Sequence, residues 1–93
     1  MKKLTSTQQR VYEELIEKVN NARSCKDYDE YWDKYCSSIQ RRWKPDYEKY
    51  YIEALNGIAG ICRAKHETLK KLEMLGLIKI INIEWNKIQL VEN

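Results

Sequence analysis

At Gly76 the hydrophobic pattern of this chain changes from a helical period to a strand-like one. Before the glycine, three leucines recur at intervals of three residues, which places them on one buried face of a helix. After it, residues 77–83 are rich in β-branched side chains, as in a strand. Gly76 itself suits the left-handed conformation that ends many helices. The sequence therefore predicts a helix over about residues 64–75 that leads directly into a β-strand.

A second apolar run, at residues 88–91, follows this strand after a polar turn at residues 84–87. Two such runs around a short loop that contains asparagine predict a two-stranded β-hairpin over about residues 77–92. An isolated hairpin is only marginally stable in water, so we expect this one to pack on the helices.

Further helices are predicted in the first two thirds of the chain. Thr5 and Gln8 form a capping-box pattern, which places the start of the first helix near Ser6, and its apolar period ends near Asn20. A stripe of tyrosines and tryptophans at helical spacing predicts a long second helix over about residues 26–43.

The third helix is expected to begin at Pro45, because proline is favoured in the first helical turn and prevents the preceding helix from continuing. Its apolar period extends to Ile58. Residues 50–52 could alternatively form a short strand, but the helical period fits them better.

The composition suits one folded domain over residues 1–93, since 43% of the residues are hydrophobic and 33% are charged. A formal net charge of +3 permits contact with phosphates without demanding it. No apolar run approaches the roughly 18 residues that a membrane-spanning helix needs. We therefore expect a cytoplasmic protein that has no membrane partner.

Catalytic and metal chemistry find little support in the sequence. The three cysteines (Cys25, Cys36 and Cys62) form no C-x-x-C pair, and His66 is the only histidine. This pattern supports neither a disulfide framework nor a zinc site. His66 has no assignable nucleophile as a partner, and a glycine-rich phosphate loop is missing. We expect a protein that is not an enzyme, with no catalytic residues, metal, cofactor or small-molecule substrate.

Residues 56–91 resemble the winged helix-turn-helix superfamily of DNA-binding domains. In that motif two short helices cross at a steep angle, so that only a small side chain fits between them. Here Ala59 takes that place, and the run from Leu69 to Ile78 looks like the end of a recognition helix entering the wing. The small or apolar residues at the other positions of the motif are Ile58, Cys62, Ala64 and Leu72.

The resemblance implies a mainly α (α+β) fold of winged helix-turn-helix type, with four helices and a C-terminal two-stranded β-hairpin as the wing. It places the helix-turn-helix at about residues 54–75 and the wing at about residues 77–92. Two features depart from the pattern of the family. Arg63 stands where glycine is usual in the turn, and the aromatic helix at about residues 26–43 is extra.

The resemblance further implies that the second helix of the motif enters the major groove of duplex DNA, as in a small regulator of transcription. The opposing interpretation is an ordinary solvated face. Glu67 favours that interpretation, because phosphates repel a carboxylate unless it accepts a hydrogen bond from cytosine. The residues expected at DNA are Arg63, Lys65, His66, Lys70, Lys71, Lys79, Asn86 and Lys87.

The aromatic stripe allows a different function. Tyrosine and tryptophan are common at protein interfaces, and they also stack on single-stranded bases. They favour a non-catalytic accessory subunit, such as a partner of a replication or polymerase protein of a mobile element or phage, with contacts at Tyr28, Trp32, Trp43 and Trp85. The alternative is a core between two antiparallel helices, with Trp85 folded back on the helices. The partner, the DNA target and the oligomeric state stay open at this point.

Overall fold

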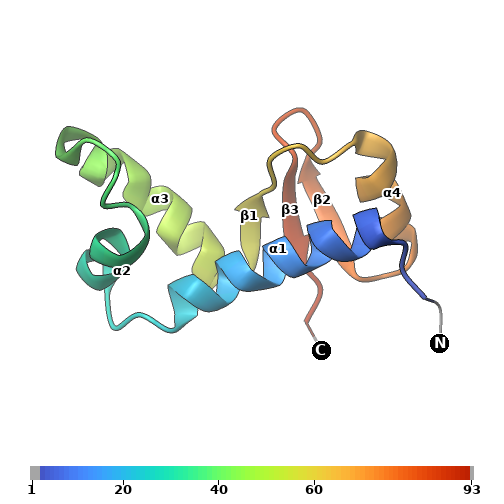
Figure 1. The fold of residues 1–93 in the computed structure, drawn as a ribbon, viewed down its shortest axis with the longest axis horizontal. Coiled ribbons are helices and arrows are strands. Elements are labelled where there is room, and N and C mark those ends of the chain that lie inside the picture. The colour runs from blue at the N-terminus through green and yellow to red at the C-terminus, as the bar shows by residue number, and fades with distance from the viewer. Residues whose placement is uncertain (1–2, 93) are drawn as a thin grey trace.

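A computed structural model describes residues 3–92 as a mainly helical α+β fold, drawn in Figure 1. The helix α1 runs along the longest dimension of the molecule, whose extents are 41 × 26 × 20 Å. The helices α2 and α3 lie at one end, and the sheet and α4 lie at the other. In chain order the elements are α1 (Ser6–Arg23), α2 (Tyr28–Tyr35), the 3₁₀ turn η1 (Arg41–Trp43), α3 (Lys44–Leu55), β1 (Ile58–Gly60), α4 (His66–Met74), β2 (Ile78–Asn82) and β3 (Lys87–Leu90).

The predicted start of the first helix is confirmed. The Thr5 hydroxyl accepts a hydrogen bond from the Gln8 amide, and the Gln8 side chain accepts one from the Thr5 amide, both at 3.1 Å. These two bonds satisfy backbone donors that a helix leaves free at its first turn. The helix continues three residues beyond the predicted end, to Arg23, and so reaches from α4 to the α2–α3 end.

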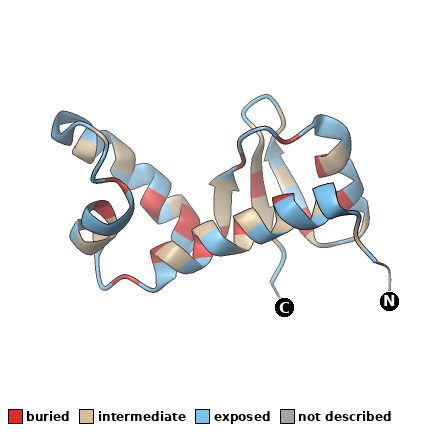
Figure 2. Cartoon of the chain, viewed as in Figure 1, coloured by how far each residue is buried: buried red, intermediate tan, exposed pale blue. Residues whose placement is uncertain are grey.

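Buried side chains form two clusters along α1, visible as the red segments of Figure 2. The larger cluster joins α1 to α4 and the sheet. It consists of Val11, Leu15, Val19, Ile61, Ala64, Leu69, Leu72, Ile78 and Ile88. The smaller one joins α1 to α3 through Ala22, Tyr51 and Ala54. Burying one large aliphatic side chain contributes about 1.5–3 kcal/mol, so the larger cluster supplies most of the stability of the α4 end.

The predicted hairpin forms, but it is part of a larger sheet. The strands β2 and β3 are antiparallel, with Ile78 opposite Leu90 and a bulge between Ile80 and Asn82. The strand β1 pairs with the other side of β3, giving an antiparallel sheet in the order β1-β3-β2. The prediction of a two-stranded sheet is therefore wrong by one strand.

The predicted third helix is confirmed from Pro45 to Leu55, but its continuation as the first helix of the helix-turn-helix is wrong. The helix α3 ends at Leu55, and Gly57 turns the chain with a φ of +83°. The next residues pair with β3, so that Ala59 lies opposite Ile88. Ala59 packs against the larger core from a strand and does not separate two crossing helices. The periodicity misled because a three-residue strand has too few residues to display its own period.

Residues 50–52, the alternative place for a short strand, lie within α3. A short strand does precede α4, but it is β1, farther along the chain. The predicted helix over about residues 64–75 is confirmed with slightly narrower bounds, and Gly76 has the expected left-handed φ, +78°.

The predicted long aromatic helix over residues 26–43 is also wrong. The helix α2 begins after Asp27, whose side chain caps it, and it ends at Tyr35. Turns follow it, and the η1 turn leads into α3 just before Pro45. Ser37 and Ser38 lie where the helix stops, which agrees with the tendency of serine to favour turns over helix interiors. The stripe of aromatic residues is thus divided between α2, η1 and α3.

Candidate functional site

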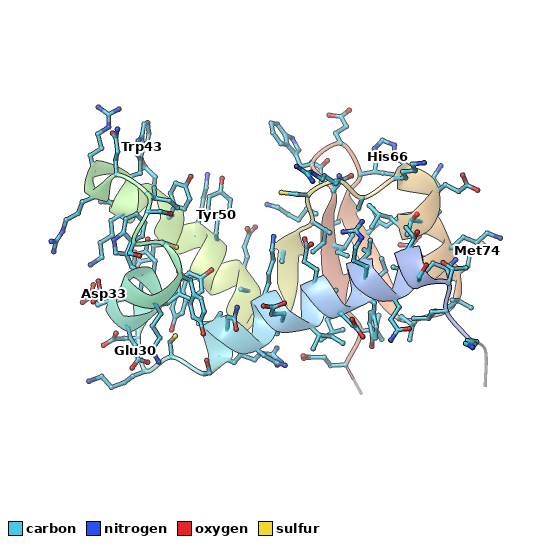
Figure 3. All side chains as sticks on the ribbon, in the orientation of Figure 1. Glu30, Asp33, Trp43, Tyr50, His66 and Met74 are labelled. Carbon is cyan, nitrogen blue, oxygen red and sulfur yellow. The ribbon has the colours of Figure 1, made fainter. Side chains whose placement is uncertain are left out.

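The outer side of α4 forms an exposed surface at one end of the molecule. Leu69 and Leu72 are fully buried beneath the helix, whereas Met74 on the outer side is 80% exposed. In Figure 3, Met74 points away from the body of the protein, and His66 marks the start of the helix near the β2–β3 turn. The helix therefore presents one face to solvent over its whole length.

Contacts at both ends hold α4 in place. Ahead of the helix, Arg63 has a φ of +60°, and its carbonyl accepts a hydrogen bond of 3.4 Å from the Arg10 guanidinium of α1. At the other end, the Glu73 carboxylate accepts a hydrogen bond of 2.8 Å from the Ile80 amide of β2. The Leu72 carbonyl accepts one from the Leu77 amide. These bonds join α4 to α1 and to the sheet, so its outer face is a fixed surface.

Positive charge outweighs negative charge on this surface, where four exposed cations stand against the exposed carboxylates of Glu67 and Glu73. Arg63, Lys65, Lys70 and Lys71 are exposed, and within residues 3–92 none of them lies within 4.0 Å of a carboxylate. The three cations of α1 differ in this respect. Arg10 and Lys18 both lie near Glu14, at 3.8 and 3.7 Å, and Arg23 pairs with Glu92. We call the four free cations together with His66 the α4 surface.

The structure separates the other predicted DNA-binding residues from the α4 surface. Ile78 and Ile80 belong to or pack on the core, so Lys79 between them points to the opposite face of the sheet. The Lys87 ammonium lies 2.9 Å from the Glu53 carboxylate of α3. Asn86 lies in the β2–β3 turn with a φ of +51°, and its Oδ1 is buried without a hydrogen-bond partner.

Of the four aromatic residues predicted to contact a protein, two belong to the interior. Trp32 is only 4% exposed, and the half-buried Tyr28 packs beside the smaller core. The Tyr28 hydroxyl donates a hydrogen bond to the Lys44 carbonyl. Burial, aided by nearby acidic groups and thiols, raises the pKa of Tyr28 to about 12. These two residues therefore belong to a core between helices, as the alternative interpretation predicts.

The other two remain accessible. Trp43 is 44% exposed, and the Arg42 guanidinium lies 5.2 Å from the centre of its ring. Trp85 is 75% exposed at the β2–β3 turn. It does not fold back onto the helices, because the Asn82 carboxamide accepts hydrogen bonds from the Glu84 and Trp85 amides and so shapes the turn around it.

The structure also has a groove between α3 and the sheet, which the sequence does not predict. It has a volume of about 880 Å³. Its walls are aromatic, and small residues line it beside β1. Figure 3 shows Tyr50 extending from α3 on the side toward the sheet. We call it the aromatic groove; its principal lining residues are Lys18, Tyr31, Tyr47, Lys49, Tyr50, Glu53, Ala54, Ala59, Gly60, Trp85 and Lys87.

The sequence contains a signal for one wall only. Tyr47 and Tyr50 belong to a visible aromatic pattern, but Trp85 faces them only because β3 brings the turn beside β1. That pairing joins residues about 30 positions apart. The local periodicity of the sequence cannot reveal such a long-range pairing.

Comparison of the chain with protein-family models, curated proteins and solved structures gave no match. No helix within residues 3–92 is long and apolar enough to cross a membrane. Within the same residues, no three His, Cys, Asp or Glu side chains gather as a set of metal ligands. The function is therefore argued from the arrangement of the chain's own residues.

Proposed function

We propose that the protein is a small, non-catalytic nucleic-acid-binding protein whose α4 surface contacts duplex DNA. The observation that supports this most strongly is the group of four exposed cations without carboxylate partners at one end of the molecule. Each cation that meets a phosphate releases condensed counterions, which supplies affinity without any base contact. In this proposal α4 acts as the recognition helix and the β2–β3 hairpin as the wing, while the strand β1 replaces the first helix of the helix-turn-helix.

The size and position of α4 suit the major groove. A helix with its side chains is about 10–12 Å across, which matches the groove width of about 12 Å, and the nine residues of α4 run about 13 Å along it. Leu69 and Leu72 anchor the inner side, which leaves Lys70 and Lys71 free to approach phosphates. Lys65 and His66, at the start of the helix, are placed to reach base edges.

Lys70→Glu combined with Lys71→Glu tests this proposal. Binding of the wild-type chain to a fluorescent duplex of about 20 base pairs should weaken steeply with salt, with a log–log slope of roughly −3 to −4 for four phosphate contacts. The double variant should bind at least about tenfold more weakly and lose roughly two units of slope. Fluorescence anisotropy at several salt concentrations measures both quantities.

Lys26→Glu combined with Lys34→Glu is the matched control, because it changes the net charge equally at the α2 end. Both residues are exposed there and distant from α4. The control should retain duplex binding within about threefold, since screening limits charge effects beyond about 10 Å at 0.1 M salt. Equal losses in the two double variants would show that only overall charge matters, and the α4 surface would lose its role.

A protein-interaction subunit is the second candidate, and the exposure of Trp43 favours it. Trp43 is 44% exposed, although it is a large apolar side chain. Tryptophan is enriched in the centres of protein interfaces. In this case Trp43→Ala should abolish capture of a partner, whereas the Lys70 and Lys71 charge reversals should leave capture intact. A pull-down with both variants separates the two candidates.

A further inference from the structure

The aromatic groove has the chemistry of a binding site separate from the α4 surface. Tyr47 and Tyr50 line it from α3, and Trp85 lines it from the β2–β3 turn. Ala54, Ala59 and Gly60 also line it and leave it open, because their side chains are small or absent. We propose that this groove binds a single strand of nucleic acid, with bases stacked on its rings and phosphates beside its lysines.

Two rings of the groove are well exposed, and those of α3 are held in place by aromatic contacts. Tyr50 is 47% exposed and Trp85 75% exposed. The ring of Tyr50 meets that of Tyr47 edge to face at 5.4 Å, and Tyr47 meets the buried Trp32 at 6.0 Å. The wall of α3 is therefore supported from the interior. Fixed, exposed aromatic faces of this kind are the platforms on which unpaired bases stack.

The charges of the groove favour an anionic occupant. Three lysines line it, Lys18, Lys49 and Lys87. Lys87 pairs with Glu53 and Lys18 lies 3.7 Å from Glu14, so Lys49 carries the free positive charge. Lys49 lies 5.1 Å from the centre of the Tyr50 ring and has no carboxylate within 4.0 Å among the described residues. A cation beside an exposed ring matches a phosphate beside a base.

One observation favours a nucleic-acid strand over an extended peptide. A peptide would add to the open edge of β1, where antiparallel alternation leaves the backbone groups of Ile58 and Gly60 pointing away from β3. The Lys18 ammonium already occupies the Gly60 carbonyl at 2.8 Å, which blocks strand addition at that position. A duplex fits poorly as well, because its bases stack on one another and offer no free faces to the rings.

The experiment measures binding of a fluorescein-labelled 15-nucleotide oligothymidylate to the full chain by fluorescence anisotropy, with quenching of tryptophan fluorescence as a second readout. Trp85→Ala and Tyr50→Ala should each weaken binding about fivefold or more, the usual effect of losing one stacked base. Trp85→Phe should retain more affinity than Trp85→Ala, because it keeps an aromatic face. Quenching should largely disappear in both Trp85 variants.

Trp43→Ala is the matched control, since Trp43 is an exposed tryptophan that does not line the groove. It should bind the oligonucleotide within about twofold of the wild type. The Lys70 and Lys71 charge reversals should weaken duplex binding at least about tenfold and spare most single-strand binding, so the two sites can fail independently. Unchanged affinity in Trp85→Ala and Tyr50→Ala would overturn the proposal, and so would no oligonucleotide binding together with capture of a protein that depends on Trp85.

Discussion

Arg63 has a left-handed backbone, with a φ of +60°, immediately ahead of α4. Such a conformation costs an L-amino acid roughly 1–2 kcal/mol, which is why glycine is usual in this kind of turn. The expectation of glycine here assumed a turn between two helices, whereas Arg63 lies in the connection from the strand β1 to α4. An arginine in its place keeps an exposed cation at the edge of the α4 surface, in agreement with a role in phosphate contact.

Tyr28 gives the protein a pH dependence at the alkaline end. Its pKa is raised from 10.0 to about 12, first by burial, and burial also raises the pKa of Tyr31 and Tyr51 beside it. The folded state thus holds the phenol protons more tightly than the unfolded state does. The stabilisation is complete below pH 10 and is lost as the pH rises toward 12. The free energy of unfolding, measured in urea, should fall across this range.

Tyr28→Phe supplies the control for this pH dependence. It removes the titrating hydroxyl and its hydrogen bond to Lys44 but keeps the ring in the core. The variant should be less stable at pH 8 and should lose less stability between pH 10 and 12. An unaltered alkaline profile would show that Tyr28 titrates like an exposed tyrosine.

At the scale of elements, the sequence predicts those whose signals are local. The Thr5 capping box and Gly76 mark the start of α1 and the end of α4, and the structure confirms both. The strand β1 escapes prediction because it has three residues and forms only through its pairing with β3. The pairing of β1 with β3 also positions the residues of the aromatic groove. The α4 surface lies on one predicted helix, whereas the contact of Lys87 with Glu53 and the aromatic groove depend on long-range packing.

Gly57→Ala tests the junction between α3 and β1. With a φ of +83° and Leu90 3.7 Å from the position of an added Cβ, the substitution meets ordinary contact distances but an unfavourable backbone. It should lower the free energy of unfolding by about 1–2 kcal/mol. Thermal and urea denaturation measure the loss. A stabilised variant would indicate that helix α3 continues through Gly57, as the sequence had predicted.

Gly76→Ala is the companion variant, because its φ is +78° and nothing lies within 4 Å of its added Cβ. It isolates the backbone cost of a left-handed alanine from any contact cost. The two variants should therefore lose similar amounts of stability.

The whole molecule carries two different surfaces at different places along α1. At one end α4 presents unpaired cations over an aliphatic core, and between α3 and the sheet the aromatic groove presents rings and lysines. The net charge of +3 conceals this distribution, because six cations of residues 3–92, including Lys18 and Lys87 of the groove, lie within 4.0 Å of carboxylates. This is why composition alone gave only weak support for nucleic-acid binding.

The central claim is that duplex DNA contacts the α4 surface, and an NMR titration of the ¹⁵N-labelled protein with a short duplex tests it most directly. We expect the amide shifts to change most over residues 63–74, with small changes over α2 and η1. Changes concentrated at α2, η1 or the exposed Trp43, with residues 63–74 unaffected at saturating duplex, would contradict the claim.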